Sequence, residues 1–466
     1  MKIQFLGAAR EVTGSKHLIT TQNGKRLILD CGMFQGKGLK TDEMNRNLGF
    51  NPAEIDHIIL SHAHIDHSGL IPYVYKQGFT GSVVCTSATR DLCSIMLADS
   101  GHIQEHDTYT FNKKRARKGL PPVEPIYKRM DAVKCMSLFI GVSYDRKFRI
   151  DENITVKFTH TGHMLGGGVA NMEIKEGDRI HRLAYTGDIG RPVNRILITP
   201  KPFPQADILI TESTYGDRLH EDSINAEKEL LGVIYNTCIE KGGKLIIPSF
   251  SIGRTQDIVY TLNKFYNENK LPRINIYVDS PLAVNATDIF RLHPECFNGD
   301  IIELMEKDPD PFGFNSLYYI KRSEDSKKLN DMKEPMVIIS ASGMMEAGRV
   351  KHHLANNISD PANTVLAVGY CAPNTLGARL LRGDKEVSIH GNHYQVKADI
   401  KRIDSYSGQG DYKEMAEFLS CQDPGHIKQT FLVHGEFDVQ AKYKTFLESK
   451  GFSNIGIPES GDEFKF

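Results

Sequence analysis

The chain has 466 residues, 40% of them apolar and 25% charged, and a formal net charge of −1. At roughly 150 residues per domain this length predicts about three units or two large ones, and the composition excludes bulk disorder and a fibrous protein. The balanced charge excludes a global attraction to nucleic acid or anionic membranes, so any polyanion has to bind a local patch.

Short apolar runs bounded by turn residues predict strands along the first part of the chain. They cover residues 3–6, 17–21, 26–30 and 57–60, with a glycine-containing loop at 31–38 and a helix that continues through residue 76. Further strands are predicted at residues 154–159, 183–186 and 207–211. Each of these ends beside a polar residue that can reach a shared site, so the pattern predicts half of an α/β sandwich.

After residue 215, predicted helices at 224–240 and 254–266 alternate with apolar strands at 244–248, 274–278, 336–340 and 364–368. Such alternation predicts a mostly parallel sheet, and hence a second domain whose loops form a crevice at the carboxyl ends of the strands. From about residue 390 the pattern returns to a strand at 430–433 and a helix at 438–450, which leaves room for only a small last unit.

The sequence also indicates a cellular compartment. No segment approaches the ~20 consecutive apolar residues of a membrane span, and residues 1–9 alternate like a strand rather than forming an export signal. The eight cysteines form no CxxC pair, which is typical of reduced thiols packed as small apolar side chains. We therefore expect a cytoplasmic protein that does not bind membranes.

The densest chemical signal is the loop Ser61-His62-Ala63-His64-Ile65-Asp66-His67-Ser68-Gly69. His62 and His64 lie two residues apart and can point the same way, while Asp66 and His67 open the next helix and can face a second point. Histidine nitrogen and aspartate oxygen bind zinc at roughly 2.0 to 2.2 Å. A lone histidine is more often structural, but four such side chains within six residues predict a metal site.

Four ligands do not complete two metal ions and leave room for water, so further ligands are expected near later strand ends. His163, Asp188 and His434 stand there, each in a turn beside glycine where the backbone can approach a metal closely. Each alone is equally well interpreted as a structural residue. Together with the first cluster they predict a shared metal centre.

At this point the sequence shows a family resemblance. The pattern His62-x-His64-x-Asp66-His67, with Asp30, His163 and Asp188 in order, resembles the metallo-β-lactamase fold. The later segments resemble the β-CASP nuclease branch of that fold, which includes the pre-mRNA 3′-end cleavage endonuclease and its archaeal and bacterial relatives. These segments are Thr-Glu-Ser-Thr-Tyr-Gly at 211–216, Ser-Ala-Ser-Gly-Met-Met at 340–345, Ala-Val-Gly-Tyr-Cys at 367–371 and Leu-Val-His-Gly-Glu at 432–436.

The resemblance covers nearly the whole chain and implies its architecture. The fold class would be α/β, a metallo-β-lactamase αββα sandwich with an inserted β-CASP domain that has a parallel sheet flanked by helices. Residues 1–210 would form the first part of the sandwich, residues 211–390 the β-CASP domain, and residues 391–466 the segment that completes the sandwich.

The resemblance also implies two zinc ions, with manganese as the alternative metal. The implied ligands are His62, His64 and His163 for one ion, Asp66, His67 and His434 for the other, and Asp188 as the bridge. Asp30 would hydrogen-bond a ligand histidine and fix its orientation. Two metals ~3.5 to 4 Å apart activate a bridging hydroxide and neutralise charge on the attacked phosphate, so water would be the nucleophile. The catalytic residues expected on this basis are Asp66, Glu212 and Gln409.

Glu212 in the first β-CASP segment and His434 in the last resemble members that act on RNA, whereas the DNA-directed branch differs at both places. The implied partner is single-stranded RNA, bound in a cleft between the domains. Turn amides from Ser340 through Ser342 to Gly343 would cradle a phosphate. The alternative interpretation of that segment is a plain strand-to-helix turn.

A local basic patch offers a second RNA-binding candidate. Residues 112–129 contain seven basic side chains and one acid, Glu124, for a local charge of +6. Lys113, Lys114 and Arg115 are the leading members of this patch. A solvated loop insertion explains such a run equally well.

The sequence departs from the family at one position. The middle β-CASP segment normally reads Ser-Ala-His-x-Asp, but residues 407–411 read Ser-Gly-Gln-Gly-Asp, with Gln409 in place of the histidine that helps the leaving group. An amide can donate a hydrogen bond but cannot deliver a proton near pH 7. Either another group substitutes as the acid, with His390 and His393 as the nearby candidates, or the reaction needs less help from an acid.

Three functional hypotheses follow. The first is a zinc-dependent ribonuclease in RNA processing or decay, acting as an endonuclease, a 5′-3′ exonuclease or both. The second is a weak or inactive RNA-binding scaffold, because Gln409 replaces the histidine. The third is hydrolysis of a small phosphodiester or thioester. The family also includes dimers, so a homodimer is a further expectation.

Overall fold

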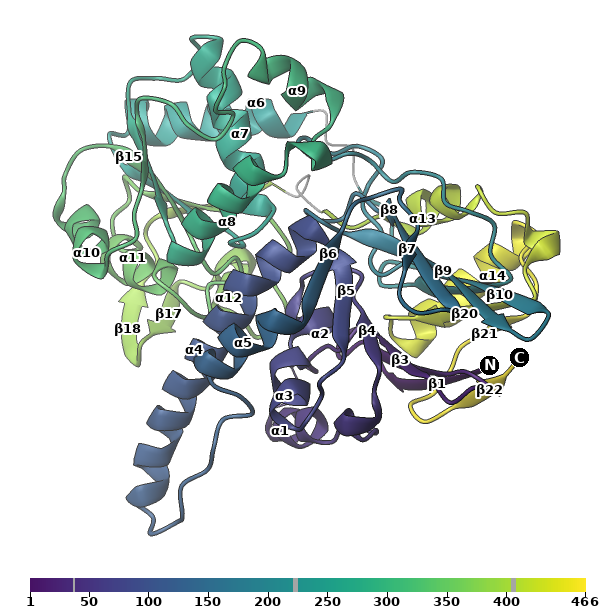
Figure 1. The fold of residues 1–466 in the computed structure, drawn as a ribbon. Coiled ribbons are helices and arrows are strands. Elements are labelled where there is room, and N and C mark those ends of the chain that lie inside the picture. The colour runs from purple at the N-terminus through teal and green to yellow at the C-terminus, as the bar shows by residue number, and fades with distance from the viewer. Residues whose placement is uncertain (37, 221–224, 404–407) are drawn as a thin grey trace. The chain divides into compact units, whose positions relative to one another are not determined.

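The computed structural model describes residues 1–36, 38–220, 225–403 and 408–466 (Figure 1). The chain divides into two compact units, one formed by Met1–Leu219 with Gln409–Phe466 and the other by His220–Gly408. Two details of the sequence predictions, the helix start at Ile224 and the position of Ser407, lie outside the described residues.

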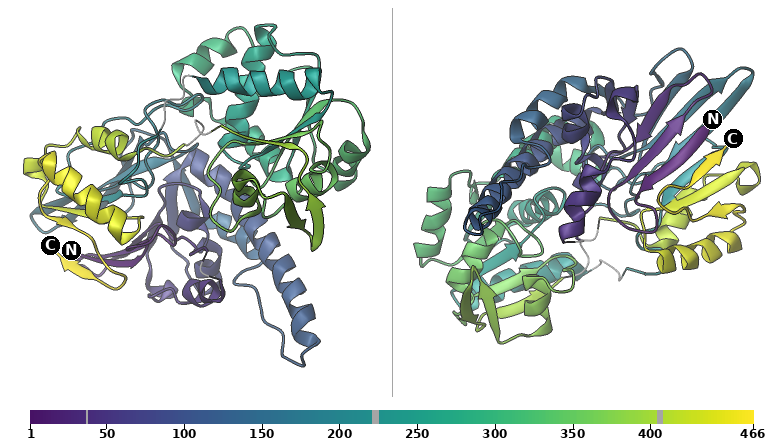
Figure 2. Two further views of the ribbon diagram at one scale, coloured as in Figure 1. Left: turned by 180° about the vertical axis from the view of Figure 1, so that it is seen from behind. Right: turned by 90° about the horizontal axis from the view of Figure 1, so that it is seen from below.

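Two seven-stranded sheets form the first unit. The first sheet has the order β22 (Glu463–Lys465), β1 (Lys2–Gly7), β2 (Lys16–Thr20), β3 (Arg26–Leu29), β4 (His57–Ile59), β5 (Ser82–Thr86), β6 (Phe139–Val142). The second has the order β21 (Ile455–Gly456), β20 (Gln429–Val433), β11 (Ile208–Glu212), β10 (Arg179–Tyr185), β9 (Gly168–Glu176), β8 (Ile154–His160), β7 (Phe148–Arg149). The last strand, β22, pairs with β1, so both chain ends lie side by side (Figure 2).

The period-two alternation of these strands decides which face is buried. Along β8, Val156 and Phe158 enter the core between the two sheets, whereas Thr155 and Lys157 face outward. Phe5 of β1 meets Phe431 of β20 across this core, with ring centroids 4.8 Å apart. Burial of apolar area at about 25 cal/mol per Å² is therefore the main force that holds the two sheets together.

Helices cover the outer faces of both sheets. They are α1 (Leu39–Arg46), α2 (Ile65–Ser68), α3 (Ile71–Lys76), α4 (Ser87–Ala116), α5 (Arg129–Cys135), α13 (Tyr412–Leu419), α14 (Phe437–Ser449) and the short turns η1 (Pro52–Glu54), η2 (Met136–Leu138) and η6 (Pro424–His426). Met415 of α13 and Tyr443 of α14 pack on Leu432 of the second sheet. The predicted αββα sandwich is confirmed. None of the helices in the described part of the chain combines the length and the apolar composition that a bilayer crossing requires.

The second unit contains the predicted parallel sheet. Its order is β14 (Leu317–Tyr319), β13 (Asn275–Asp279), β15 (Met336–Ser340), β12 (Lys244–Pro248), β16 (Thr364–Ala367), β19 (Asp399–Arg402), with every pair parallel. A hairpin of β17 (Glu386–Ile389) and β18 (Asn392–Gln395) follows α12. The helices are α6 (Ala226–Ile234), α7 (Arg254–Asn267), α8 (Pro281–Leu292), α9 (Gly299–Met305), α10 (Ser323–Asp331), α11 (Val350–Asn357), α12 (Leu376–Arg382), with η4 (Tyr235–Glu240) and η5 (Pro294–Cys296).

The boundaries between the two compact units lie at residues 219/220 and 408/409. The second position follows from strand pairing, because β19 pairs with β16 and so belongs to the parallel sheet of the second unit. The division at 210/211 and 390/391 remains a prediction from the sequence.

A buried carboxylate braces the second unit at the carboxyl end of β13. Asp279 accepts hydrogen bonds from His353 Nε2 (2.6 Å), Ser326 Oγ (2.5 Å) and Arg349 NH1 (2.6 Å). Burial alone would raise the pKa of Asp279, but these three bonds to the charged form hold it below its usual value. The carboxylate thus ties β13 to α10, to α11 and to the loop that precedes α11.

We predict that Asp279→Asn destabilises the protein by about 3 kcal/mol at pH 7, because the substitution breaks a buried charge pair. A depressed pKa contributes stability above the unfolded value of about 3.9 and loses it as pH falls through the folded value. The stability gap between wild type and variant is therefore constant above about pH 5 and narrows below it. Urea denaturation between pH 7 and pH 3.5 measures this gap, with exposed Asp331→Asn as the control. A gap that stays constant to pH 3.5 would contradict the assignment.

Candidate metal centre

The strands of the first unit bring polar residues to one edge. In the second sheet, β10, β11 and β20 are mutually parallel and β8 runs the same way, since both β8 and β10 are antiparallel to β9. The carboxyl end of β8 leads to His163, that of β10 to Asp188 and that of β20 to His434, while β11 ends at Glu212. In the first sheet, the parallel strands β3 and β4 lead to Asp30 and to the loop at His62. Segments distant in the chain therefore meet because parallel strands end at the same edge.

A first group of ligand atoms comprises three imidazoles and a carboxylate. His62 Nε2 lies 3.1 Å from His64 Nδ1, and His163 Nε2 lies 3.2 Å from the same atom. Asp188 Oδ2 lies 3.5 Å from His163 Nε2 and 3.9 Å from His62 Nε2. All four side chains offer an atom within 4.8 Å of the others.

A second group lies on the other side of Asp188. His67 Nε2 is 3.1 Å from His434 Nε2, which is 3.5 Å from Asp66 Oδ2. Asp188 Oδ1 lies 3.3 Å from His67 Nε2, while its Oδ2 faces the first group. Asp188 is therefore placed between the two groups, with one oxygen toward each.

These distances fit a metal ion in each group. Ligands at about 2.05 Å from a tetrahedral zinc lie roughly 3.3 Å apart, close to the spacings above. The electrostatics agree, because burial keeps the pKa of His62 well below its usual value and lowers that of His163 to about 4. Neutral imidazole is the form that binds a metal. In the second group, burial alone would lower the pKa of His67. The charges of Asp188 and Asp30 raise this pKa well above its usual value, so the two carboxylates favour a cation beside them.

Asp30 orients the histidines from behind. Its side chain is fully buried and accepts from Ser61 N, Ser61 Oγ and Tyr185 OH at 2.7, 2.7 and 2.6 Å. It also lies 2.6 Å from His67 Nδ1. When His67 Nδ1 donates this bond, its Nε2 lone pair faces the second group. Likewise His62 Nδ1 lies 3.0 Å from Ser61 Oγ, which leaves its Nε2 toward the first group.

The structure adds Ser61, Tyr185 and Thr214 to the candidate site, three residues to which the sequence analysis gave no role. All three stand inside or directly beside the motifs quoted for the ligands. The available signal was their position next to a ligand, but a hydroxyl near a motif has no fixed partner until the fold is known.

The backbone is unusual at two of these positions. Asp30 and His434 both have positive φ, 55° and 54°, a region that non-glycine residues rarely adopt. Gly187, with φ 54°, precedes Asp188, and a Cβ there would lie 2.6 Å from the Ser61 side chain. Such strained turns cluster where function fixes side-chain direction.

Gln409 lies in the same centre. It pairs with Gly190 in an isolated bridge, and its Nε2 lies 2.5 Å from Glu212 Oε2, 2.9 Å from Thr214 Oγ1 and 3.4 Å from Asp188 Oδ2. Three acceptors around one nitrogen fix the amide orientation, because the reverse orientation would place the amide oxygen against two carboxylates. The donor capacity of Gln409 is therefore directed at the protein.

Thr214 links Gln409 to His434. Thr214 Oγ1 lies 2.9 Å from His434 Nδ1 and donates to the His434 carbonyl at 3.0 Å. The hydroxyl thus accepts from Gln409 and from His434 Nδ1–H, which points His434 Nε2 at the second group. Beside it, burial and the charge of Asp188 raise the pKa of Glu212 to about 7, although the amide of Ile189 donates to this carboxylate.

The predicted phosphate cradle belongs to the second unit. Ser340 Oγ donates to the Asp279 carbonyl, and Ser342 Oγ accepts from the amides of Glu346 and Ala347. Gly343 packs so closely on Phe250 that a Cβ would lie 2.9 Å from its ring. Both hydroxyls are engaged in shaping the turn, so a phosphate there would meet backbone amides.

The remaining predicted residues lie elsewhere. His390 stacks on His352 with ring centroids 4.5 Å apart, and His393 lies 2.8 Å from Glu386, both in the second unit. Lys113, Lys114 and Arg115 lie in the last turn of α4, so the interpretation of the basic stretch as a loop insertion is wrong for residues 112–116.

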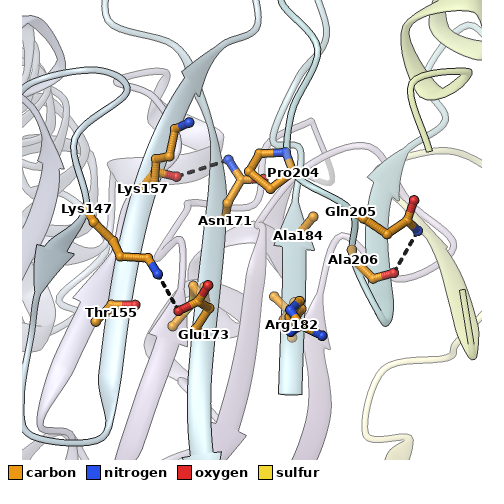
Figure 3. A pocket seen from close by; sticks show the side chains of 12 residues that line it. Lys147, Thr155, Lys157, Asn171, Glu173, Arg182, Ala184, Pro204, Gln205 and Ala206 are labelled. Atoms are coloured by element: carbon orange, nitrogen blue, oxygen red, sulfur yellow. Dashed lines mark hydrogen bonds and ion pairs between the residues drawn. The ribbon is translucent and has the colours of Figure 1, made fainter. Parts of the chain in front are cut away.

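A separate small pocket lies on the outer face of the second sheet (Figure 3). It has a volume of about 60 Å³, and its lining includes Lys147, Lys157, Asn171 and Arg182. Lys147 is already paired with Glu173 at 2.7 Å, as the dashed line in Figure 3 shows. None of the histidines described above lines it, so the chemistry belongs to the strand-end cluster.

Fold and site together define a metal-dependent hydrolase. Three family models match the chain: the metallo-beta-lactamase superfamily over residues 14–234, the Beta-Casp domain over residues 255–380, and the Zn-dependent metallo-hydrolase RNA specificity domain over residues 393–458. The chain belongs to the Beta-Casp group of the metallo-beta-lactamase superfamily, as the sequence predicted.

Curated relatives match over almost the whole chain. Ribonuclease TTHA0252 of Thermus thermophilus is 33% identical, with 94% of this chain and 93% of the relative covered. An RNase J-like protein of Methanocaldococcus jannaschii is also 33% identical, over 93% and 92%. Transcription termination factor FttA of Methanosarcina mazei is 30% identical, over 94% of this chain and 67% of the relative. A solved protein of unknown function from Enterococcus faecalis V583 shares the fold, with a TM-score of 0.56 at 12% identity over 99% of each chain.

The Thr214 hydroxyl gives a testable prediction. Thr214→Val keeps the side-chain shape but removes the acceptor for His434 Nδ1, so the affinity for a metal held by His434 falls by about tenfold. Chelator competition followed by metal analysis measures this affinity without any assay of activity. The matched control is Thr445→Val, which changes an exposed threonine of α14. Equal affinities in the two variants would remove Thr214 from the metal centre.

Proposed function

We propose that this protein is a ribonuclease that binds two zinc ions and hydrolyses phosphodiester bonds of single-stranded RNA. The single observation that carries the proposal is the convergence of His62, His64, Asp66, His67, His163, Asp188 and His434 into two ligand groups with Asp188 between them. It is supported by the RNA specificity domain and by the similarity to a protein named as a ribonuclease. Manganese, which takes nitrogen and oxygen ligands, is the alternative metal.

A bound metal pair would supply Lewis acidity and activate water at neutral pH. The chain's own residues orient this centre. Asp30 holds His67, and through Ser61 it holds His62. Gln409 holds Glu212 directly and His434 through Thr214. Its amide carries no titrating proton, so protonation of the leaving oxygen falls to another group or to water.

RNA binding has two candidate surfaces. In the turn after β15, no acceptor within the described part of the chain takes a hydrogen bond from the amides of Gly343 and Met344, which leaves two donors for a phosphate. The basic end of α4, with Lys113, Lys114 and Arg115, supplies charge for the RNA backbone.

Removal of a ligand from either group should abolish cleavage. We predict that His64→Ala and Asp188→Ala each lower the cleavage rate of end-labelled single-stranded RNA at least 100-fold and lower the bound zinc. Exposed His426→Ala serves as the control, because its ring lies on the surface beside Asp423. Full activity of His64→Ala with an unchanged zinc content would overturn the proposal.

Restoring a histidine at position 409 tests the departure from the family. We predict that Gln409→His raises the cleavage rate, because a positioned acid typically contributes 10²- to 10⁴-fold. The alternative function, an RNA-binding scaffold, rests on the same residue. If the wild-type protein binds RNA without cutting it and only the variant cuts, the scaffold is the better description. Turnover of small esters without any effect on RNA would favour the third hypothesis.

The oligomeric state is a separate part of the proposal. Relatives of this family form dimers, and we propose a homodimer on that resemblance alone. Sedimentation equilibrium decides it.

A further inference from the structure

The helix α4 is longer than its packing requires. Its 30 residues correspond to about 45 Å at 1.5 Å per residue. The buried positions all lie in its first half, from Ala88 to Gly101. The second half, from residue 102, and the returning segment to residue 128 form what we call the arm. Figures 1 and 2 show the arm extending past α1 and α3 of its own unit.

The arm has a defined shape. Asn112 bonds both backbone groups of Val123, at 2.9 Å each, and Arg115 Nε donates to the Pro121 carbonyl at 2.7 Å. At the base, Arg46 NH2 donates to the Glu124 carbonyl at 2.7 Å. These hydrogen bonds hold the returning segment along the helix, so the arm has a defined tertiary structure.

The tip of the arm combines positive charge with exposed aromatic rings. Tyr109 is 61% exposed and Phe111 46% exposed. Lys113 Nζ lies 4.3 Å from the Tyr109 ring centroid, and Arg115 Cζ lies 5.7 Å from that of Phe111. Glu124 pairs with Lys128 at the base, at 3.3 Å. Among the residues that the structure describes, no carboxylate pairs with the basic side chains of the tip, which are Lys113, Lys114, Arg115, Arg117 and Lys118.

This combination matches a single nucleic-acid strand. Cationic side chains bind phosphates, and aromatic faces stack on bases with about 1 to 3 kcal/mol per base. Basic residues at a helix C-terminus also favour the helix dipole, but that effect does not account for two exposed rings beside them. The positive charge and the exposed rings of the tip are therefore complementary to a nucleic-acid strand, which has anionic phosphates and planar bases.

The position of the helix fixes how far this contact lies from the metal centre. Thr86 and Thr89, at the start of α4, donate to the Gly166 carbonyl at 2.7 and 2.8 Å, and Gly166 belongs to the loop of His163. The helix thus begins beside the first ligand group and ends about 45 Å away. At roughly 3.4 Å per nucleotide of a helical strand, this length corresponds to about 13 nucleotides.

We propose that the arm binds the RNA strand about a dozen nucleotides from the bond that is cut, so that RNAs long enough to reach it bind more tightly. The inference deepens the proposed function and rests on it for the position of the cut. The contact itself is a binding property of the arm and is measurable without cleavage.

The experiment measures affinity against RNA length. Fluorescence anisotropy with single-stranded RNAs of 5, 10, 15, 20 and 30 nucleotides is carried out in an Asp188→Ala background, which prevents cleavage. We expect the affinity to rise at least tenfold between about 10 and 20 nucleotides. We expect no such rise in affinity with RNA length, the length step, in the variant Lys113→Gln/Lys114→Gln/Arg117→Gln/Lys118→Gln. For the 30-mer, the slope of log affinity against log salt concentration, the salt slope, becomes shallower by up to about 3 in this variant.

Two further variants isolate the cause. Tyr109→Ala/Phe111→Ala keeps the charge and removes the stacking, so the length step shrinks while the salt slope stays. The matched control Lys175→Gln/Arg179→Gln/Lys442→Gln/Lys450→Gln removes four exposed charges elsewhere in the same unit and keeps the step. Circular dichroism checks that α4 remains helical in each variant.

The outcomes separate this inference from the proposed function. A length step and salt slope that are the same in the arm variant and the control variant would overturn the role of the arm. A change of sedimentation in the arm variant, with unchanged RNA affinity, would assign the arm to contacts between copies and also overturn it. Cleavage of the 30-mer by the wild-type protein tests the proposed function independently of either result.

Discussion

The carboxylate of Asp30 is the interaction on which the metal centre depends. It is fully buried, and it is held by four hydrogen bonds from Ser61, Tyr185 and His67. A buried charge is tolerated only when it is paired and hydrogen-bonded, so these partners have little freedom to move. Because Ser61 lies in the loop after β4, His67 in the following helix α2 and Tyr185 at the end of β10, Asp30 joins the two sheets where their strands end. This arrangement orients the rings of His62 and His67 through their hydrogen bonds to Ser61 and Asp30.

Gln409 changes the proton-transfer chemistry of the site more than its shape. In the position where the family has a histidine, this chain has a side chain that always donates and never titrates. Its donor atom faces Glu212 and Thr214, and through Thr214 it acts on His434. The residue is therefore better understood as a positioning group for neighbouring side chains than as a proton donor. In the proposed function, such a substitution would keep the candidate metal ligands in place while it removes a titrating group.

The proposed function places chemistry and substrate contact on different parts of the chain. The candidate ligands stand in loops and in the short helix α2 at the edge of the sandwich, where packing of the two sheets fixes their backbones. The basic arm projects from the same unit, and the parallel sheet of the second unit carries a turn in which the amides of Gly343 and Met344 donate to no acceptor among the described residues. An almost neutral protein can bind a polyanion in this way, because the charge is gathered in one place rather than spread over the surface.

The sequence by itself determined the fold class, the family and the positions of several core strands, because apolar periodicity and the His62–His67 spacing are local signals. It did not predict α4, the 30-residue helix. The strands predicted at 244–248 and 336–340 match β12 and β15 residue for residue. Only the tertiary structure decided which atoms meet. Asp188 places one oxygen toward each candidate ligand group, Thr214 bonds His434 across 220 residues of chain, and the basic stretch begins inside a helix. The reason is physical: periodicity records which face of an element is buried, whereas the partner of a buried polar group depends on strand pairing between distant segments.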